Sequence, residues 1–298
     1  MSFLDHIKRC NNADMSQFEP WFVGRTRAGY VHREFAGQLP APLFEHRGKA
    51  WHLDAALKTC DSRTNAVHAF LLELRAAGQF GKQWREEAYP VTCIYADPPL
   101  MTMERAAVPW FGVRAFGPHM TGFVRKKDGL HIWVPRRSYS KPTFPGELDN
   151  TVAGGQPAAL GIRENLIKEC AEEAAIPRAL AEQAKAVSCV AYWNQAGLQL
   201  KPDLMTCFDL ELPESFTPRA VDGEVERFEL WPARVVFEKV RDTTEFKYNC
   251  NLVLIDFFVR RTDCRRRAGF LSHSRGFAQF PVKFMNQIIC NSQRLDVT

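Results

Sequence analysis

Apolar side chains in the first third of this chain recur at helical spacing and, in shorter stretches, at strand spacing. A helix is predicted over residues 65–78, because its apolar residues fall three or four positions apart and Gly78 can end it. Those apolar residues are Val67, Phe70, Leu71 and Leu74. A helix over residues 3–9 and a hairpin of residues 21–23 with residues 28–31 are also predicted. Together they indicate a small α+β unit.

The rest of the chain alternates strand patterns with helical ones. Strands are predicted over residues 111–116, 121–125, 131–136, 187–193, 198–212 and 224–230. The fourth and fifth of these should form a hairpin around Gly197. Pro232 suits the first turn of a helix, and an apolar helix over residues 246–259 should close the sheet. The expected class is α/β (α+β), with a mixed sheet flanked by helices in the second half.

The length and charge of the chain suggest three parts. A chain of 298 residues with 46% hydrophobic residues suits two domains, for which we expect residues 1–110 and 111–261. Residues 262–298 form a basic tail, and the eight Lys or Arg against two Asp in residues 260–298 account for the net charge of +5. Either a changed reading frame or a lineage-specific extension would explain this shift in composition. Since the first 259 residues are almost neutral, a nucleic-acid partner is not expected.

Cysteines and hydropathy indicate the compartment. Nine cysteines without paired spacing favour reduced thiols in a cytoplasmic protein, and no Cys-x-x-Cys pattern predicts structural zinc. No apolar run is long enough to cross a membrane, so a membrane partner is not expected. The start of the chain reads as an amphipathic helix rather than a secretory signal. The protein could be a monomer or a homodimer.

Three glutamates within one predicted helical turn carry the chemistry. Glu169, Glu172 and Glu173 stand at positions i, i+3 and i+4, so a helix would place their carboxylates on one face. Their mutual repulsion would be relieved by Mg²⁺, which prefers carboxylate oxygens as ligands and binds substrate phosphates. Upstream, Gly154 and Gly155 would let the backbone turn tightly where a ligand can approach. The alternative is a solvated acidic face on an ordinary amphipathic helix, whose opposite face packs Ile167, Cys170 and Ala174 on the core.

The whole string resembles the Nudix box, the metal-binding loop and helix of hydrolases that act on diphosphates linked to another group. The matching positions are Gly154, Lys168 in place of Arg, Glu169, Cys170, Glu172, Glu173, Ala175 in place of the closing Gly, and Ile176. Leu160 stands where the box has an early glutamate. The resemblance implies an α/β/α sandwich for residues 111–261, a hydrolase, and Mg²⁺ as cofactor, with Mn²⁺ able to substitute.

The flanks are similar to a narrower group, the thiamine-pyrophosphokinase-related Nudix hydrolases, which carry an extra N-terminal domain of uncharacterised type. The similar segments include Cys10–Asn12, Phe18–Trp21, His119–Phe123, Trp133–Ser138, Leu148–Ala153 and Asp222–Glu226. This resemblance implies hydrolysis of thiamine diphosphate, or of its oxidised analogues, to the monophosphate and phosphate. The almost neutral chain before residue 260 should let glutamates dominate the site and so favour a cationic ring.

Further site residues are expected around the box. Glu224 and Glu226 are two positions apart on a predicted strand, so both side chains could point to the same side of the sheet. Either could act as the base or complete the metal site, and Glu226 is preferred. Glu173 is a further catalytic candidate. The other reading is a surface pair on an edge strand. Candidates for binding the small-molecule diphosphate substrate are Arg136, Arg137, Lys141, His119 and Asn150.

Two other functions remain open from the sequence. An isomerase of the isopentenyl-diphosphate type would need a cysteine and a glutamate on opposite faces of a small pocket, and no cysteine stands in a motif for it. A catalytically weak diphosphate-binding protein would keep the box only for its fold. The glutamates at Glu169, Glu172 and Glu173 favour the hydrolase.

Overall fold

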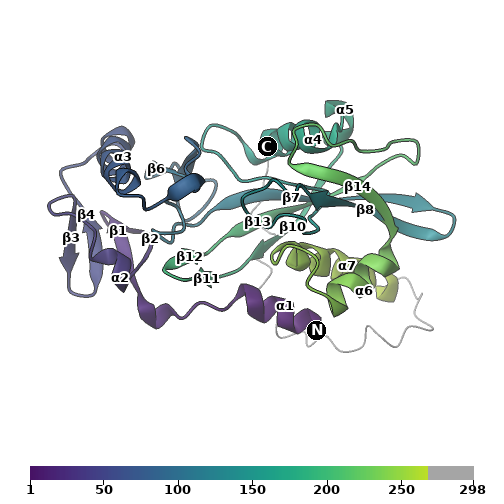
Figure 1. Cartoon of the computed structure of the whole chain (residues 1–298), viewed down its shortest axis with the longest axis horizontal. Coiled ribbons are helices and arrows are strands. Elements are labelled where there is room, and N and C mark those ends of the chain that lie inside the picture. Colours follow the sequence, from purple (N-terminus) through teal and green to yellow (C-terminus); the bar gives the residue numbers. More distant parts are fainter. Residues whose placement is uncertain (268–298) are drawn as a thin grey trace.

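The structure is a computed structural model that describes the backbone of residues 1–267 and the side chains of residues 1–261. It has two lobes side by side, and the chain passes between them after α1 Phe3–Cys10 and again near residue 115 (Figure 1). The predicted tail lies mostly outside the described residues. None of the described helices is both long and apolar enough to cross a membrane.

The N-terminal lobe is a small α+β unit. Its main sheet has the strand order β2-β1-β4-β3, and β5 and β6 form a separate antiparallel pair against which α3 packs. The bounds are β1 Phe18–Val23, β2 Thr26–His32, α2 Arg33–Ala36, β3 Phe44–Arg47, β4 Ala50–Leu53, α3 Cys60–Ala76, β5 Ala88–Val91 and β6 Met101–Glu104, with single 3₁₀ turns at Met15–Gln17 and Gly81–Gln83. The predicted hairpin is confirmed, since Trp21 pairs with Gly29.

The C-terminal lobe is built on a mixed sheet with the order β10-β13-β7-β8-β14, and the short β9 pairs with β7. Only β13 and β7 are parallel; the other neighbours are antiparallel. The bounds are β7 Phe116–Lys126, β8 Gly129–Arg137, β9 Val152–Ala153, β10 Lys185–Ala191, β11 Asn194–Ala196, β12 Gln199–Lys201, β13 Leu204–Glu211 and β14 Val225–Pro232. The predicted mixed sheet is therefore confirmed.

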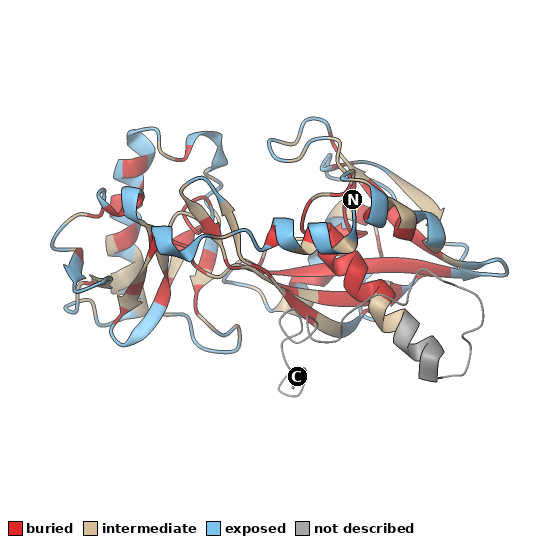
Figure 2. Ribbon diagram, turned by 90° about the horizontal axis from the view of Figure 1, so that it is seen from below, coloured by how far each residue is buried: buried red, intermediate tan, exposed pale blue. Residues whose placement is uncertain are grey.

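Helices cover both faces of this sheet. Figure 1 shows α4 and α5 above the sheet and α6 and α7 below it, and Figure 2 shows buried residues running along the strands and α7. The bounds are α4 Ile162–Ala174, α5 Arg178–Ala181, α6 Ala233–Asp242 and α7 Cys250–Arg267. Met120 and Val124 of β7 join the core under α4, whereas Phe123 joins the core over α7. This is the expected α/β/α sandwich.

Three predicted elements are wrong in detail. The predicted strand over residues 111–116 does not form before Phe116, where β7 begins: Phe111 and Gly112 lie in a turn, because Gly112 has a φ of +50° and the Phe111 carbonyl accepts from Trp21 Nε1 and Tyr30 N. The apolar helix begins at Cys250 rather than residue 246, since Phe246 bridges to Leu148. The strand over residues 198–212 is broken at Pro202 and Asp203 into β12 and β13.

The hydrophobic cores suggest where the lobes meet. One core gathers buried side chains between Trp21 and Val113, close to the expected boundary at residue 110. However, α1 Phe3–Cys10 packs against α7 of the other lobe, so the first residues of the chain do not belong to the N-terminal core. The expected division at residues 110 and 261 stays a prediction.

Candidate functional site

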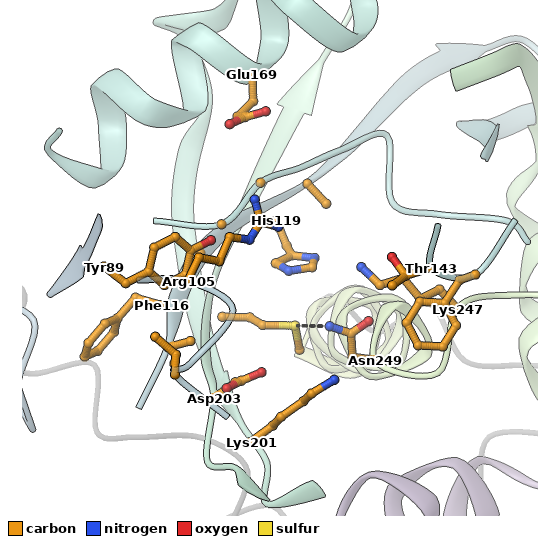
Figure 3. A pocket seen from close by; sticks show the side chains of 18 of the residues that line it. Tyr89, Arg105, Phe116, His119, Thr143, Glu169, Lys201, Asp203, Lys247 and Asn249 are labelled. Carbon is orange, nitrogen blue, oxygen red and sulfur yellow. Dashed lines mark hydrogen bonds between the residues drawn. The ribbon is translucent and has the colours of Figure 1, made fainter. Parts of the chain in front are cut away.

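A cavity of about 570 Å³ opens between the two lobes. Its walls come from the β5–β6 hairpin of the N-terminal lobe and, in the C-terminal lobe, from β7, α4, the β13 edge and the segment before α7. Figure 3 shows Glu169 at one end, Lys201 and Asp203 at the other, and His119 between them. The cavity lies at the box helix.

Helix α4 carries the glutamates and is fixed by its apolar face. Ile167, Cys170 and Ala174 are buried in the core beneath it, as the spacing predicts. The face toward the cavity brings Glu169 and Glu173, one helical turn apart, into the lining. The local sequence pattern therefore determines this wall of the cavity.

Glu173 is half-buried, and its carboxylate accepts a hydrogen bond from the Ala153 backbone N–H at 3.1 Å. Burial raises its pKa well above the ordinary value, and the charges of Asp149, Glu169 and Glu224 raise it further, against the lowering effect of the Ala153 N–H. The pKa of Glu169 is also raised, first by burial and then by repulsion from Glu172 and Glu224, although Lys168 opposes this. These two acids lie where negative charge is already crowded.

The third glutamate of the triad is placed differently. Glu172 does not line the cavity; its carboxylate pairs with Lys168 at 2.6 Å and is 49% exposed. Among the described residues, no group of three His, Cys, Asp or Glu side chains is yet arranged to hold a metal ion. A hard cation fits Glu169 and Glu173, whose acidic oxygens share one cavity with Glu224, because a positive ion would relieve the mutual repulsion.

The distal carboxylate in the cavity is Glu224, not Glu226. Glu224 lies just before β14, lines the cavity and pairs with Lys141. Burial raises the pKa of Glu224, but the hydrogen bond from Lys141 and nearby cations lower it to below its ordinary value. Glu226 is exposed and outside the lining, because a bulge between Val225 and Arg227 breaks the strand alternation. The preference for Glu226 therefore has no support from the geometry.

His119 and Asn150 form a buried pair. The Asn150 Oδ1 lies 2.9 Å from His119 Nδ1, and its Nδ2 donates weakly to the Cys250 carbonyl at 3.4 Å. Only His119 lines the cavity. Burial, with the charge of Lys247, lowers the pKa of His119 to about 4, so the ring is neutral at pH 7. Asn150 thus positions His119 rather than reaching a ligand itself.

The three predicted phosphate-binding cations have different surroundings. Arg136 lies outside the lining and donates to the Gly146 carbonyl at 2.7 Å. Arg137 lines the cavity, but it holds the following loop through Asp149 at 2.6 Å and the Thr143 and Phe144 carbonyls. Lys141 lines the cavity as well. Of the three, Lys141 is best placed for a phosphate, and Arg136 is a residue of β8 whose side chain holds the loop that follows.

Gly154 and Gly155 are required for close contacts and not for a left-handed turn, since neither has a positive φ. A Cβ on Gly154 would lie 2.6 Å from Glu169 Cδ, and one on Gly155 only 1.6 Å from the Tyr89 hydroxyl. Side chains of Glu169 and Tyr89 therefore occupy the space next to the two glycines. Both glycines line the cavity.

Several lining residues have no signal in the sequence. Tyr89 and Arg105 come from the N-terminal lobe, and Lys201, Asp203 and Lys247 from the far end (Figure 3). The lining as a whole carries seven cations, Arg85, Arg105, Arg137, Lys141, Lys168, Lys201 and Lys247, against six acids. The expectation that glutamates alone dominate the site is therefore wrong.

Comparisons with known proteins agree with this picture. The family model described as "Domain of unknown function (DUF4743)" matches residues 2–115. The chain is 38% identical over 271 residues to "Nudix hydrolase 20, chloroplastic" of Arabidopsis thaliana, covering 87% of this chain and 72% of that protein. It is 37% identical over 264 residues, with the same coverage, to "Nudix hydrolase 24, chloroplastic" of the same plant.

Solved structures are less similar. The NUDIX domain of Shewanella oneidensis NrtR, crystallised with ADP ribose, matches with a TM-score of 0.41 and 12% identity, covering 51% of this chain and 90% of that chain.

Proposed function

This chain belongs to the Nudix hydrolase family and is a diphosphate hydrolase, and we propose that it cleaves thiamine diphosphate or an oxidised analogue with the help of Mg²⁺. The products would be the monophosphate and inorganic phosphate. One observation carries the proposal: Glu169 and Glu173 of the box helix and Glu224 of a distant segment line the same cavity.

The residues that would hold the cation are Glu169 and Glu173, with Glu172 able to join them only by leaving Lys168. When bound, a magnesium ion offsets the negative charge that builds on the phosphoryl oxygens during hydrolysis. Glu173 is already oriented, because the Ala153 N–H holds one of its carboxylate oxygens.

Glu224 is the proposed general base. Lys141 keeps its carboxylate ionised by lowering its pKa, so it can accept a proton from the attacking water at neutral pH. A Glu173 base would be the alternative, since its raised pKa suits proton transfer. Neutral His119, held by Asn150, is available to hydrogen-bond a phosphoryl oxygen or the attacking water.

The substrate half of the proposal rests on the resemblance to the thiamine-pyrophosphokinase-related group. The cavity supports a ring-bearing diphosphate, because Tyr89, Phe116, Phe144, Tyr192 and Tyr248 supply aromatic faces along its walls. A cationic ring on such a face gains about 0.5–2 kcal/mol, which makes it a preference rather than a strict filter. The cations in the lining oppose that gain, so a neutral-ring analogue also suits the site.

The other functions are less well supported. The isomerase would need a cysteine in the cavity, and none of the described lining residues is a cysteine. A binding protein without activity would leave the crowded pair of Glu169 and Glu173 without a role. The hydrolase uses both.

Location and assembly belong to the same proposal. None of the seven cysteines in the described part forms a disulfide, which suits the expected cytoplasm, whereas the two plant relatives are named chloroplastic. We propose that the protein works in a reducing compartment as a monomer or homodimer. We also propose that its domains divide at residues 110 and 261.

A panel of diphosphates tests the function. Purified protein is incubated with Mg²⁺ and thiamine diphosphate, its oxidised analogues, ADP-ribose or a nucleoside triphosphate, and phosphate is measured with and without a coupled phosphatase. We expect the highest kcat/KM with a thiamine derivative and direct release of phosphate. Faster turnover of ADP-ribose than of every thiamine derivative would overturn the substrate and leave the hydrolase standing.

A further inference from the structure

The loop of the box, residues 154–161, is held by the N-terminal lobe at three points. The Ala158 backbone N–H donates to the Ala88 carbonyl at 2.9 Å, and the Tyr95 hydroxyl donates to the Leu160 carbonyl at 3.2 Å. The Tyr89 hydroxyl lies against Gly155 so closely that a methyl group there would overlap it. All three contacts come from the β5–β6 hairpin and its connecting loop.

This hairpin is itself firmly positioned. The buried carboxylate of Glu104, at the end of β6, accepts from the backbone N–H groups of Arg85, Glu87 and Ala106 at 2.9–3.2 Å. Tyr89 is paired with Met103 across the hairpin, and both side chains are buried in the N-terminal core. Displacing Tyr89 would therefore disturb that core, which makes the hairpin a rigid support for the loop.

Tyr89 also has a hydroxyl that the protein does not use. The residue is only 5% exposed, yet among the described residues its hydroxyl has no hydrogen-bond partner. The hydroxyl oxygen is not one of the fully buried unpaired atoms of the described residues, so it is open to the cavity, where a ligand can reach it. Figure 3 shows this hydroxyl at the inner end of the ring, toward the cavity that also holds Glu169. A bound ligand would supply the missing partner.

The chemistry of that ligand follows from the group and its neighbours. Burial raises the pKa of Tyr89, so the hydroxyl stays protonated and acts as a donor. Arg105 lies beside the same ring, 5.6 Å from its centre, and still has donors free after its ion pair with Glu87 at 2.8 Å. A tyrosine donor and a guanidinium suit anionic oxygen atoms, such as those of a phosphoryl group.

We propose that the N-terminal lobe, which matches a family model of unknown function, is part of the hydrolytic site. Tyr89 donates a hydrogen bond to a phosphoryl oxygen of the bound diphosphate, and the β5–β6 hairpin fixes the box loop beside it. This inference rests on the proposed hydrolysis, but it adds a substrate-binding residue outside the C-terminal lobe.

The test of Tyr89 is the variant Tyr89→Phe, which keeps the ring and removes only the hydroxyl. We expect kcat/KM for the best substrate of the panel, and the affinity for methylenediphosphonate with Mg²⁺, to fall about ten- to a hundredfold, the effect of losing a hydrogen bond to a charged group. Tyr30→Phe is the matched control, because Tyr30 lies in the same lobe, packs on Trp193 and is outside the cavity.

The outcomes separate the two ideas. An unchanged kcat/KM and affinity in Tyr89→Phe, in a wild-type protein that hydrolyses diphosphates, overturns the inference alone. A wild-type protein that hydrolyses no diphosphate and does not bind methylenediphosphonate overturns the proposed function and the inference together. Equal losses in Tyr30→Phe would show a general effect on the lobe and also overturn the role of Tyr89.

The support of the loop is tested by Tyr95→Phe. This variant removes the hydrogen bond to the Leu160 carbonyl, and it keeps the ring that packs edge-on against the lining residue Phe116 at 5.3 Å; Tyr95 itself lies outside the lining. We expect kcat to fall about two- to tenfold with little change in KM, since a neutral hydrogen bond that positions the loop is lost. Unchanged kcat and KM would overturn this part.

Discussion

The two walls of the cavity depend on different features of the sequence and the fold. The glutamate wall, formed by α4 and Glu224, takes Glu169 and Glu173 from one helical turn, and their spacing alone places them together. The hairpin wall, residues 85–105, is brought from another lobe by packing and has no motif of its own. Local spacing is therefore enough to predict the position of the acidic groups, whereas the position of the groups opposite them depends on the whole fold.

The glutamate wall also shows that spacing does not decide the use of each carboxylate. Glu172 and Glu173 are neighbours on α4, yet Glu172 pairs with Lys168 at the surface, whereas Glu173 lies half-buried in the cavity and forms no ion pair within the described part of the chain. The ion pair with Lys168 distinguishes Glu172 from Glu173. Substitutions at both residues test this distinction, and others test the contrast between the two walls.

The largest effect is expected from Glu173→Gln. The amide keeps the acceptor for the Ala153 N–H but removes the charge, so kcat with Mg²⁺ should fall at least about a hundredfold. Because burial and repulsion raise the pKa of Glu173, the melting temperature without metal should stay equal or rise. Kinetics and thermal unfolding measure both.

Glu172→Gln is the matched control for that variant. It lies on the same helix but is exposed and paired with Lys168, so kcat should fall by about tenfold or less. Wild-type turnover in Glu173→Gln, or equal losses in both variants, would contradict the distinction between the two glutamates.

A second, smaller effect concerns an acid that is buried but paired. Asp149 is bonded by Arg137 at 2.6 Å and by the Cys250 thiol at 2.7 Å. Burial raises its pKa, but Lys247, Arg137 and these bonds lower it from 3.8 to about 2. Its ionised form therefore stabilises the fold above its ordinary pKa, and this is lost as the pH falls toward 2.

Asp149→Asn should lower the free energy of unfolding by roughly 2–3 kcal/mol at pH 7, as the size of the pKa shift implies. Urea unfolding at several pH values measures this. The gap to the wild type should narrow as the pH falls from about 4 toward about 2. A gap that is the same at about pH 3 and about pH 7 would show that the cost is not ionic.

The third experiment tests the contact between the walls. Gly155→Ala places a methyl group 1.6 Å from the Tyr89 hydroxyl and 2.9 Å from Cζ, which should cost about 1–3 kcal/mol of unfolding free energy and reduce kcat. Adding Tyr89→Phe removes the nearer atom, so the double variant should be more stable than the two single costs predict. Urea unfolding of the four proteins gives the coupling.

Gly161→Ala is the control in the same loop, because nothing lies within 4 Å of an added Cβ there and its φ is −71°. It should change stability by less than about 1 kcal/mol. If the changes in unfolding free energy caused by Gly155→Ala and Tyr89→Phe simply add, the added methyl group and the Tyr89 hydroxyl do not clash.

Much of the fold could be predicted from the sequence, because it depends on local patterns. The helices over residues 3–9 and 65–78 and the central strands followed from apolar spacing. The strand over residues 111–116 failed, since its pattern could not reveal that Gly112 turns and that Trp21 takes the Phe111 carbonyl. Such hydrogen bonds join segments far apart in the chain.

The site divides in the same way. The glutamates of α4 followed from their spacing, but the choice between Glu224 and Glu226 did not, because a bulge shifts the strand by one residue. Arg136 and Arg137 are adjacent and alike in sequence, yet only Arg137 faces the cavity. Tyr89, Lys201 and Lys247 could not be found, since nothing near them in the sequence marks them.

The smallest effect concerns the end of the box helix. Ala175 has φ 52° and ψ 31°, and the Ile176 N–H bonds back to the Cys170 carbonyl at 2.9 Å, a geometry that favours glycine, as the box pattern has it. Ala175→Gly should raise the free energy of unfolding by about 0.5–1 kcal/mol, because relief of strain outweighs the greater freedom of glycine in the unfolded chain. Ala171→Gly, inside the same helix and exposed, should instead lower it by about 1 kcal/mol. Urea unfolding distinguishes the two, and kcat should not change in either, since both residues lie outside the cavity. If Ala175→Gly lowers the free energy of unfolding, the left-handed backbone of Ala175 is not a strained end of the helix that carries the glutamates.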